Sequence, residues 1–219
     1  MDDVDPRLAS ALAIQLGRRR LALESGAEHV GWKLGVGARE RIGNGPVVGH
    51  LTSESQLATG GTYRAGDALR LHADAEVALE LGGDVSPDTD EHSAGQAIAG
   101  YGAALEIVDL SAPDDAEAIV AGNVFHRAFA FGPVQPSLPS AALEGRLVVN
   151  GAIRCSAAAP RGFAHLICSV ARVLQAVGAR LYAGDRLITG AVVQASVAPG
   201  DAVVADFGAL GQAQLTIAN

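Results

Sequence analysis

The strongest structural signal in this chain is the stretch HADAEVALEL, residues 72–81. Apolar residues occupy every second position, which is the period of a β-strand that packs one face against a core. The opposite face carries the carboxylates of Asp74, Glu76 and Glu80. Like charges on one strand face repel each other. We therefore expect either that water covers this face or that a cation lies between the acids.

A third acid from elsewhere would complete a site for a cation. Glu106 lies in another apolar stretch, AALEIVDL at 103–110, where a lone buried carboxylate would be costly. Carboxylate oxygens suit hard ions such as Mg²⁺, Mn²⁺ or Ca²⁺, and His72 is a possible fourth ligand. The alternative is that these acids form the solvated face of a sheet.

Turn signals around this stretch favour a mostly antiparallel sheet system. Three Gly-Asp pairs each precede an apolar run and predict a turn that leads into a strand. These pairs begin at Gly66, Gly184 and Gly200. Asn150-Gly151 lies within alternating sequence and predicts a hairpin.

Helices are expected at scattered positions between the strands. One starts at Asp5-Pro6, and the others lie near 93–100, 114–122 and 162–177. This order predicts an α+β fold. We expect a single domain over residues 1–219, in which residues 1–28 form an N-terminal helical segment.

The composition excludes several classes of protein. Hydrophobic residues make up 49% of the 219 residues and charged residues 18%, which is typical of a globular chain. The net charge of −8 argues against a nucleic-acid or anionic membrane surface. Cys155 and Cys168 lack a metal or CxxC spacing and are expected to be free thiols. The sequence shows no signal peptide or membrane span, so we expect a cytoplasmic protein.

Several short motifs follow one another in a specific order. They are GWKLG (31–35), GHLTSE (49–54), ADAEVALEL (73–81), AALEIVD (103–109), Asn123 and GDRLITGA (184–191). This ordered set resembles the fumarylacetoacetate hydrolase superfamily, and within it the branch of 2-keto-4-pentenoate hydratases and 4-oxalocrotonate decarboxylases. The resemblance implies mostly antiparallel sheets rolled into a fumarylacetoacetate-hydrolase-like fold with a few flanking helices.

The resemblance also implies roles for particular residues. It implies a divalent ion, Mg²⁺ or Mn²⁺, and a small 2-oxo acid or dienol as substrate. The implied metal ligands are Asp74, Glu76 and Glu106; the implied catalytic residues are Lys33 and Glu54; the implied substrate contacts are Asn123, Thr189 and Gly190. Relatives are dimers or assemblies of dimers, so a homodimer or higher homo-oligomer is expected.

The chain departs from the family pattern at several positions. Asp74 and Glu54 stand where the family usually has Glu and Asp, respectively. The residues after Asn123, VFHRAF, are bulkier than the small and hydroxylic residues expected there. A C–C hydrolase of this superfamily needs a histidine base: His50 is the nearest match, while His126 is expected to cap or line the site.

The leading hypothesis is a metal-dependent hydratase that converts a 2-hydroxy-2,4-dienoate to a 4-hydroxy-2-oxo acid. A 2-oxo acid decarboxylase of the 4-oxalocrotonate type, or a C–C hydrolase, would use the same metal site. A divergent, non-catalytic binding or partner subunit is the alternative from a different class.

Overall fold

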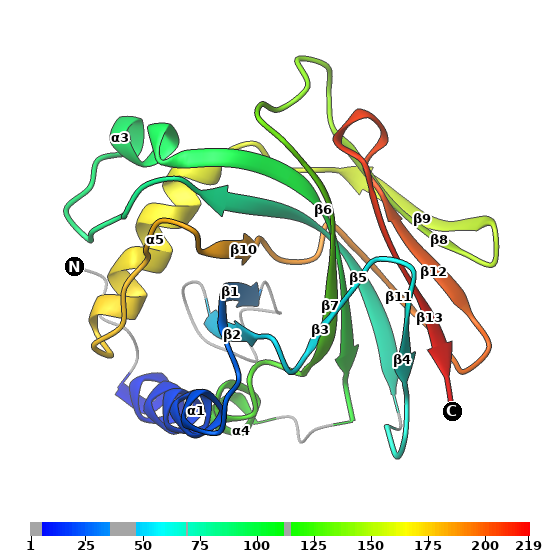
Figure 1. The fold of residues 1–219 in the computed structure, drawn as a ribbon, viewed down its shortest axis with the longest axis horizontal. Coiled ribbons are helices and arrows are strands. Elements are labelled where there is room, and N and C mark those ends of the chain that lie inside the picture. Colours follow the sequence, from blue (N-terminus) through cyan, green and yellow to red (C-terminus); the bar gives the residue numbers. More distant parts are fainter. Residues whose placement is uncertain (1–5, 36–46, 69, 112–114) are drawn as a thin grey trace.

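The computed structural model describes residues 6–35, 47–68, 70–111 and 115–219 (Figure 1). Its helices are α1 (Pro6–Glu24), α3 (Glu91–Gln96), α4 (Ala116–Ala121), α5 (Phe163–Gln175) and the 3₁₀-helix η1 (Gly208–Leu210). Its strands are β1 (His29–Gly35), β2 (Val47–Thr52), β3 (Gln56–Leu57), β4 (Gly61–Arg64), β5 (Leu71–Leu81), β6 (Ile98–Asp109), β7 (His126–Gln135), β8 (Glu144–Val149), β9 (Ala152–Ala158), β10 (Arg186–Ile188), β11 (Val193–Ser196), β12 (Ala202–Asp206) and β13 (Gln212–Ala218).

The described strands form two sheets. The larger has the order β2-β1-β10-β5-β6-β7-β3, with β11 also pairing with β5, and the smaller has the order β4-β13-β12-β8-β9. Most neighbours are antiparallel; the parallel pairs are β1 with β10, β13 with β4, and β3 with β7. Figure 1 shows the long strands β5 and β6 curving strongly, so that the larger sheet is curled rather than flat. The mostly antiparallel α+β fold expected from the sequence is confirmed.

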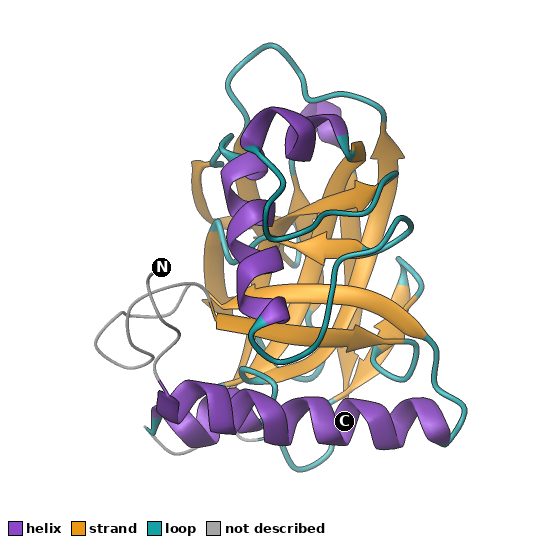
Figure 2. Ribbon diagram, turned by 90° about the vertical axis from the view of Figure 1, so that its left-hand side faces the viewer, coloured by secondary structure: helices purple, strands orange, loops and turns teal. Residues whose placement is uncertain are grey.

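Helices cover one side of the larger sheet and one of its ends (Figure 2). In this view α5 runs alongside the strands, and α1 crosses below them. The fully buried Gln15 attaches α1 by donating from its side-chain amide to the carbonyls of Val48 and Val120, at 3.2 and 2.7 Å. These bonds join α1 to β2 and α4. No helix in the described part of the chain is long and apolar enough to span a membrane.

Strand β5 has the two-faced character that its sequence predicts. Ala73, Ala75, Val77, Leu79 and Leu81 all belong to the main hydrophobic core. The opposite face is also buried: Asp74 is 6% exposed and Glu76 is 1% exposed. The alternative of a solvated acidic face is therefore wrong for these two residues.

The predicted hairpin and turns are confirmed, and one predicted helix is shorter than expected. Asn150 and Gly151, both with positive φ, form the β8–β9 hairpin turn, and the three Gly-Asp pairs precede β5, β10 and β12. Cys155 and Cys168 are free. The helix predicted near 93–100 ends at Gln96, because Ile98 begins the pairing of β6 with β5. The predicted cap Asp5 lies outside the described residues.

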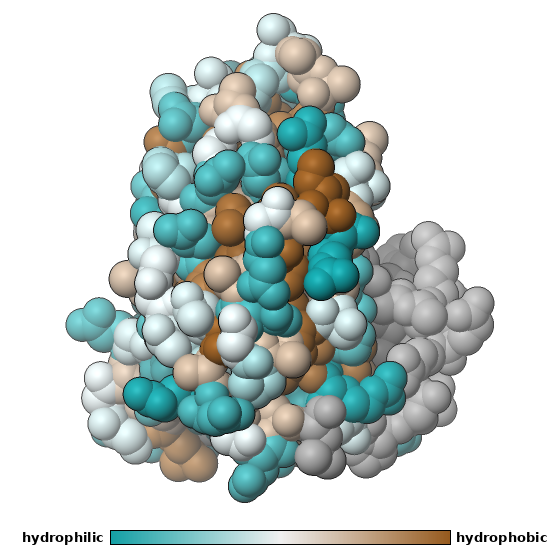
Figure 3. Space-filling model, turned by 90° about the vertical axis from the view of Figure 1, so that its right-hand side faces the viewer, coloured by the Kyte–Doolittle hydropathy of each residue, from teal (hydrophilic) through white to brown (hydrophobic). Residues whose placement is uncertain are grey.

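Strand β9 is one of the two edge strands of the smaller sheet, the other being β4, and most residues of β9 are exposed. Ile153 on this strand is 60% exposed. Figure 3 shows the corresponding side of the molecule, where brown apolar groups lie among polar ones. An exposed edge strand offers unpaired backbone groups to another chain.

Candidate metal centre

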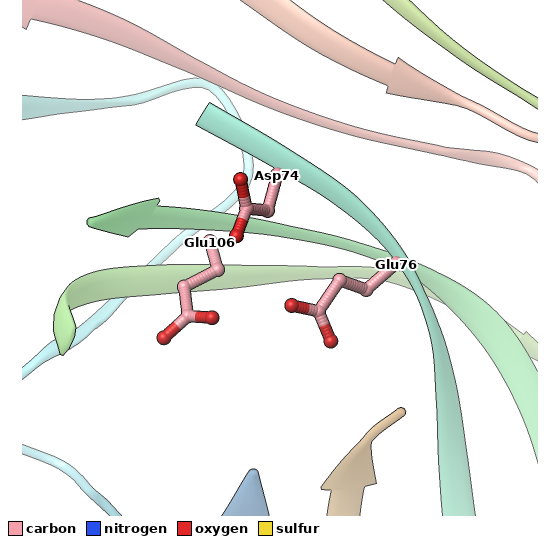
Figure 4. Close-up of side chains that lie close together, drawn as sticks. All are labelled: Asp74, Glu76 and Glu106. Carbon is pink, nitrogen blue, oxygen red and sulfur yellow. The ribbon is translucent and has the colours of Figure 1, made fainter. Parts of the chain in front are cut away.

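Three carboxylates from two neighbouring strands meet inside the curled sheet. Asp74 and Glu76 come from β5 and Glu106 from β6, and Figure 4 shows all three side chains directed into the same space. One oxygen from each lies within 4.8 Å of the others. Antiparallel register explains the meeting, since Asp74 is the direct cross-strand partner of Glu106. The cluster that the sequence predicted is therefore assembled by β5 and β6, and His72 is not part of it.

Glu76 is held in place from the far end of the chain. The backbone N–H of Gly190 donates to its Oε2 at 2.6 Å. Gly190 has φ +93°, a conformation that favours glycine over residues with a side chain. The adjacent Thr189 donates both its backbone N–H and its hydroxyl to the carbonyl of Val77, at 3.1 and 3.0 Å. Thr189 and Gly190, predicted to contact substrate, thus also fasten the chain after β10 to β5.

Asp74 has an unsatisfied oxygen. Its Oδ1 is buried and has no hydrogen-bond partner, while Gln194, its cross-strand neighbour on β11, hydrogen-bonds the side chain. Burial, and next the charge of Glu106, raise the pKa of Asp74 to about 7. A buried acceptor left unpaired is costly, and a bound cation would satisfy it.

Glu106 differs from the other two acids because cations and donors surround it. The ammonium of Lys33 and Nδ1 of His126 both bind its Oε1, the latter at 2.6 Å. Burial alone would raise the pKa of Glu106, but Lys33 and His126 outweigh burial and lower it to about 2. Glu106 is therefore ionised at neutral pH, whereas burial, Glu106 and Asp74 raise the pKa of Glu76 well above its usual value.

Lys33 reaches the cluster from β1. A bulge between His29 and Gly31 precedes it, and Gly31 is required there because a Cβ would lie 1.8 Å from the carbonyl oxygen of Arg186. The Lys33 ammonium is buried and donates to Glu106 and, at 3.0 Å, to the carbonyl of Val124. An ammonium has three N–H groups, and the hydrogen bonds of the described residues occupy two of them. One donor thus remains for a substrate.

His126 is the residue that the sequence interpretation undervalued. It is buried, with Nδ1 on Glu106 and Nε2 2.9 Å from the hydroxyl of Ser55. Burial lowers the pKa of His126, opposed by its hydrogen bond to Glu106. The bulky run VFHRAF was the available signal, but nothing in it indicated which way the ring would point.

The remaining predicted residues lie at the edge of this cluster. Asn123 does not contact the carboxylates: its amide makes two hydrogen bonds with the backbone of His50, at 2.8 and 3.0 Å. Glu54 is exposed, in the turn between β2 and β3, next to the Ser55 that contacts His126. His50 lies against Gln15, and burial chiefly lowers its pKa to about 4.

The residues present fit a hard divalent cation. The three carboxylates and the one ammonium leave two negative charges when all four groups are ionised. Oxygen donors of this kind are the ligands that Mg²⁺, Mn²⁺ and Ca²⁺ prefer. The unpartnered oxygen of Asp74 supplies a second, independent reason for an ion at this point.

Comparisons with solved structures give the same fold. The chain is similar to 4-oxalocrotonate decarboxylase from Pseudomonas putida G7 in complex with magnesium and adipate, with a TM-score of 0.85 and 21% identity over 96% of this chain and 86% of that one. For the same enzyme in complex with calcium and acetate, the TM-score is 0.85 and the identity 23%, over 96% of this chain and 85% of that one. For the 2-hydroxyhepta-2,4-diene-1,7-dioate isomerase from Mycobacterium marinum, the TM-score is 0.65 and the identity 18%, over 87% of this chain and 75% of that one.

Sequence comparisons identify the family. No curated protein sequence matches the chain. The family model described as "Fumarylacetoacetate (FAA) hydrolase C-terminal", however, matches residues 38–218, which include the three acids and His126 but not Lys33. Because this match covers most of the chain, the protein belongs to the fumarylacetoacetate hydrolase family of enzymes.

Proposed function

We propose that this protein is a divalent-metal-dependent lyase that acts on small 2-oxo acids or their enols. The observation that carries this proposal is the buried cluster of Asp74, Glu76 and Glu106, with its unpartnered carboxylate oxygen, beside Lys33. These acids would hold Mg²⁺ or Mn²⁺. A bound ion would act as a Lewis acid and stabilise negative charge that develops on a substrate oxygen.

The residues of the chain supply what the ion does not. The remaining N–H of Lys33 would hold a substrate carboxylate or give a proton to a substrate carbon. Asn123 fixes β2 by its bonds to His50, and thereby the strand that lies beside Lys33. Buried apolar side chains next to the acids, including Phe129, Phe131 and Ile188, exclude bulk water from this part of the site.

The leading reaction is hydration of a 2-hydroxy-2,4-dienoate to a 4-hydroxy-2-oxo acid. In the first step the 2-hydroxyl loses its proton and C5 gains one; water then adds to C4 and a proton to C3. The turn that contains Glu54 and Ser55 supports this reaction, because it joins a solvent-exposed carboxylate to the polar chain Ser55–His126–Glu106. Glu54 would take the proton of the attacking water.

Decarboxylation of a 2-oxo dicarboxylic acid is the second candidate. The TM-score of 0.85 to 4-oxalocrotonate decarboxylase favours it, compared with 0.65 to the isomerase. This reaction needs the metal, a proton donor and no activated water, so Glu54 would be dispensable. The carbon–carbon bond to the departing carboxylate breaks, CO₂ leaves, and a proton replaces it on carbon.

Product analysis separates the two reactions. Purified protein is incubated with Mg²⁺ and either 2-hydroxypenta-2,4-dienoate or 4-oxalocrotonate, and products are followed by NMR. We expect 4-hydroxy-2-oxopentanoate from the first substrate, and its loss in Glu76→Gln. Release of CO₂ from the second substrate without hydration of the first would favour the decarboxylase; full turnover by Glu76→Gln would contradict both proposals.

We also propose that the protein is a homodimer or a larger homo-oligomer in the cytoplasm. The exposed edge strand β9, with Ile153 on its surface, supports association with a second copy. Light scattering on the purified protein tests this proposal. A mass close to 22.2 kDa would contradict it.

A further inference from the structure

The segment after Asn123 has an unusual backbone. Asn123, Val124 and Phe125 all have positive φ, at 64°, 54° and 64°. Such a conformation is uncommon for residues other than glycine and is unfavourable for a β-branched or bulky residue. The surrounding structure must therefore hold this turn in place.

Several contacts hold this left-handed turn, and one of them, the bond from Lys33, belongs to the site itself. The Asn123 amide binds the His50 backbone, and the Val124 carbonyl accepts from Lys33. The backbone N–H of His126 donates to the Asn123 carbonyl at 3.1 Å, and Val124 packs with the residues of α1 and α4. Immediately after the turn, β7 begins at His126. The turn thereby directs the His126 ring at Glu106.

Both ring nitrogens of His126 have partners in the structure. Nδ1 lies 2.6 Å from Oε1 of Glu106, the same oxygen that accepts from Lys33, so Nδ1 carries the proton and donates to this carboxylate oxygen. In the neutral ring Nε2 is then the acceptor, 2.9 Å from the Ser55 hydroxyl, whose one proton lies between Nε2 and the carbonyl of Thr52 at 3.3 Å. The Phe129 ring, 5.7 Å away between centroids, packs against the imidazole. Ser55 and Phe129 thus fix the plane of the ring.

The two donors to Glu106 act on one oxygen. Lys33 and His126 both bind Oε1, so neither occupies the second oxygen of this carboxylate. Two donors from different strands, β1 and β7, hold this oxygen in place. They leave its other oxygen directed at the space shared with Asp74 and Glu76.

We propose that His126 is a positioning residue that orients Glu106 for a divalent cation and thereby sets the affinity of the site for metal. This inference rests on the proposed metal-dependent function, and it adds a residue that holds a ligand without touching the ion. Partners of this kind commonly change metal affinity or activity about 10–100-fold when removed.

The test substitutes His126 with Asn and with Gln, because each amide side chain places its nitrogen near one of the two imidazole nitrogens. The side-chain nitrogen of Asn can replace Nδ1, and that of Gln can replace Nε2. Mn²⁺ binding to metal-stripped wild-type protein, His126→Asn and His126→Gln is measured by electron paramagnetic resonance of the unbound ion. Urea unfolding of each metal-free protein shows that it is folded, and His165→Gln, on the exposed start of α5, is the matched control.

We expect His126→Gln to weaken Mn²⁺ binding about 10–100-fold. His126→Asn and His165→Gln should remain within about threefold of the wild type, because a donor to Glu106 is kept. Equal losses in the Asn and Gln variants, or no loss in either, would overturn the proposal. If the variants differ as expected but the wild type turns over no 2-oxo acid, the proposed function is overturned and this inference is supported. Absence of Mn²⁺ binding by wild type would overturn both.

Discussion

Asp74 and Glu106 lie directly opposite each other on neighbouring antiparallel strands, both buried and both carrying a carboxyl group. Their environments separate their pKa values, to about 7 for Asp74 and about 2 for Glu106. Opposed like charges destabilise a sheet unless a counter-ion lies between them. We therefore expect the stability of the protein to depend on both pH and a bound divalent cation.

The metal-free protein should gain stability from Asp74→Asn as the pH rises. The pKa of Asp74 is raised by folding, so the folded state binds more protons than the unfolded state between about pH 4 and 7. The stabilisation that protonated Asp74 gives the folded state is present at low pH and lost as the pH rises through 7. We expect the free energy of unfolding of Asp74→Asn, minus that of the wild type, to increase by up to about 3 kcal/mol from pH 5 to 8.

Urea unfolding in the presence of a chelator measures this difference. The comparison between variants is needed because His50, with its pKa lowered to about 4 by burial, titrates with the opposite sign. Saturating Mg²⁺ at pH 8 should then stabilise the wild type and not Asp74→Asn. A pH-independent difference, or equal stabilisation by Mg²⁺, would contradict this prediction.

Gly49→Ala should impair catalysis by displacing Lys33. A Cβ at this position would lie 2.6 Å from Cγ of Lys33 and 2.7 Å from Oδ1 of Asn123. The Lys33 side chain would have to move, and a misplacement of about 1 Å can lower a rate about 100-fold. We expect kcat to fall by at least about tenfold, with Mn²⁺ binding changed much less. Gly66→Ala, in a turn with open space around it, is a control for stability alone.

Asn123 has both a conformational and a hydrogen-bonding role, and two substitutions separate them. Asn123→Ala loses the two bonds to His50 and places alanine at φ 64°, so unfolding should become easier by about 2–3 kcal/mol. Asn123→Gly loses the bonds but tolerates the backbone, and should recover about 1 kcal/mol of that loss. Thermal and urea unfolding test this order; an alanine variant as stable as the glycine variant would show that the turn is not strained.

Gly190→Ala should weaken metal binding through Glu76. The substitution places a side chain at φ 93° and disturbs the N–H that holds Oε2 of Glu76. We expect Mn²⁺ affinity to fall about 10–100-fold. Gly184→Ala, also at positive φ but in the turn before β10, is the matched control for strain without contact to Glu76. Equal affinity in the two variants would contradict this role of Gly190.

The period of residues 72–81 was sufficient to predict β5, its two faces and the acid pair on one of them. The sequence also predicted that Glu106 lies beside the acid pair of β5, because a lone buried carboxylate needs partners. The position of His126 was not, because it depends on three consecutive left-handed residues, two of which, Val124 and Phe125, disfavour that conformation. Such a turn exists because tertiary contacts impose it.

The polar groups of Thr189 and Asn123 show a second limit of sequence interpretation. The resemblance implied that both contact substrate, and this stays a prediction. In the structure each also bonds the backbone of a distant strand, Thr189 to Val77 and Asn123 to His50. Motif spacing cannot distinguish a side chain that touches substrate from one that holds the chain beside it.

The most direct test follows the ultraviolet band of freshly prepared 2-hydroxypenta-2,4-dienoate mixed with metal-stripped protein, with and without Mg²⁺. The acids of β5 and β6 predict that the band disappears faster than spontaneous ketonisation only when Mg²⁺ is present, and that Glu76→Gln abolishes this difference. Two results would contradict the assignment of Asp74, Glu76 and Glu106 as the catalytic metal site. One is loss of the band at the same rate with and without Mg²⁺; the other is an Mg²⁺-dependent rate in Glu76→Gln equal to that of the wild type.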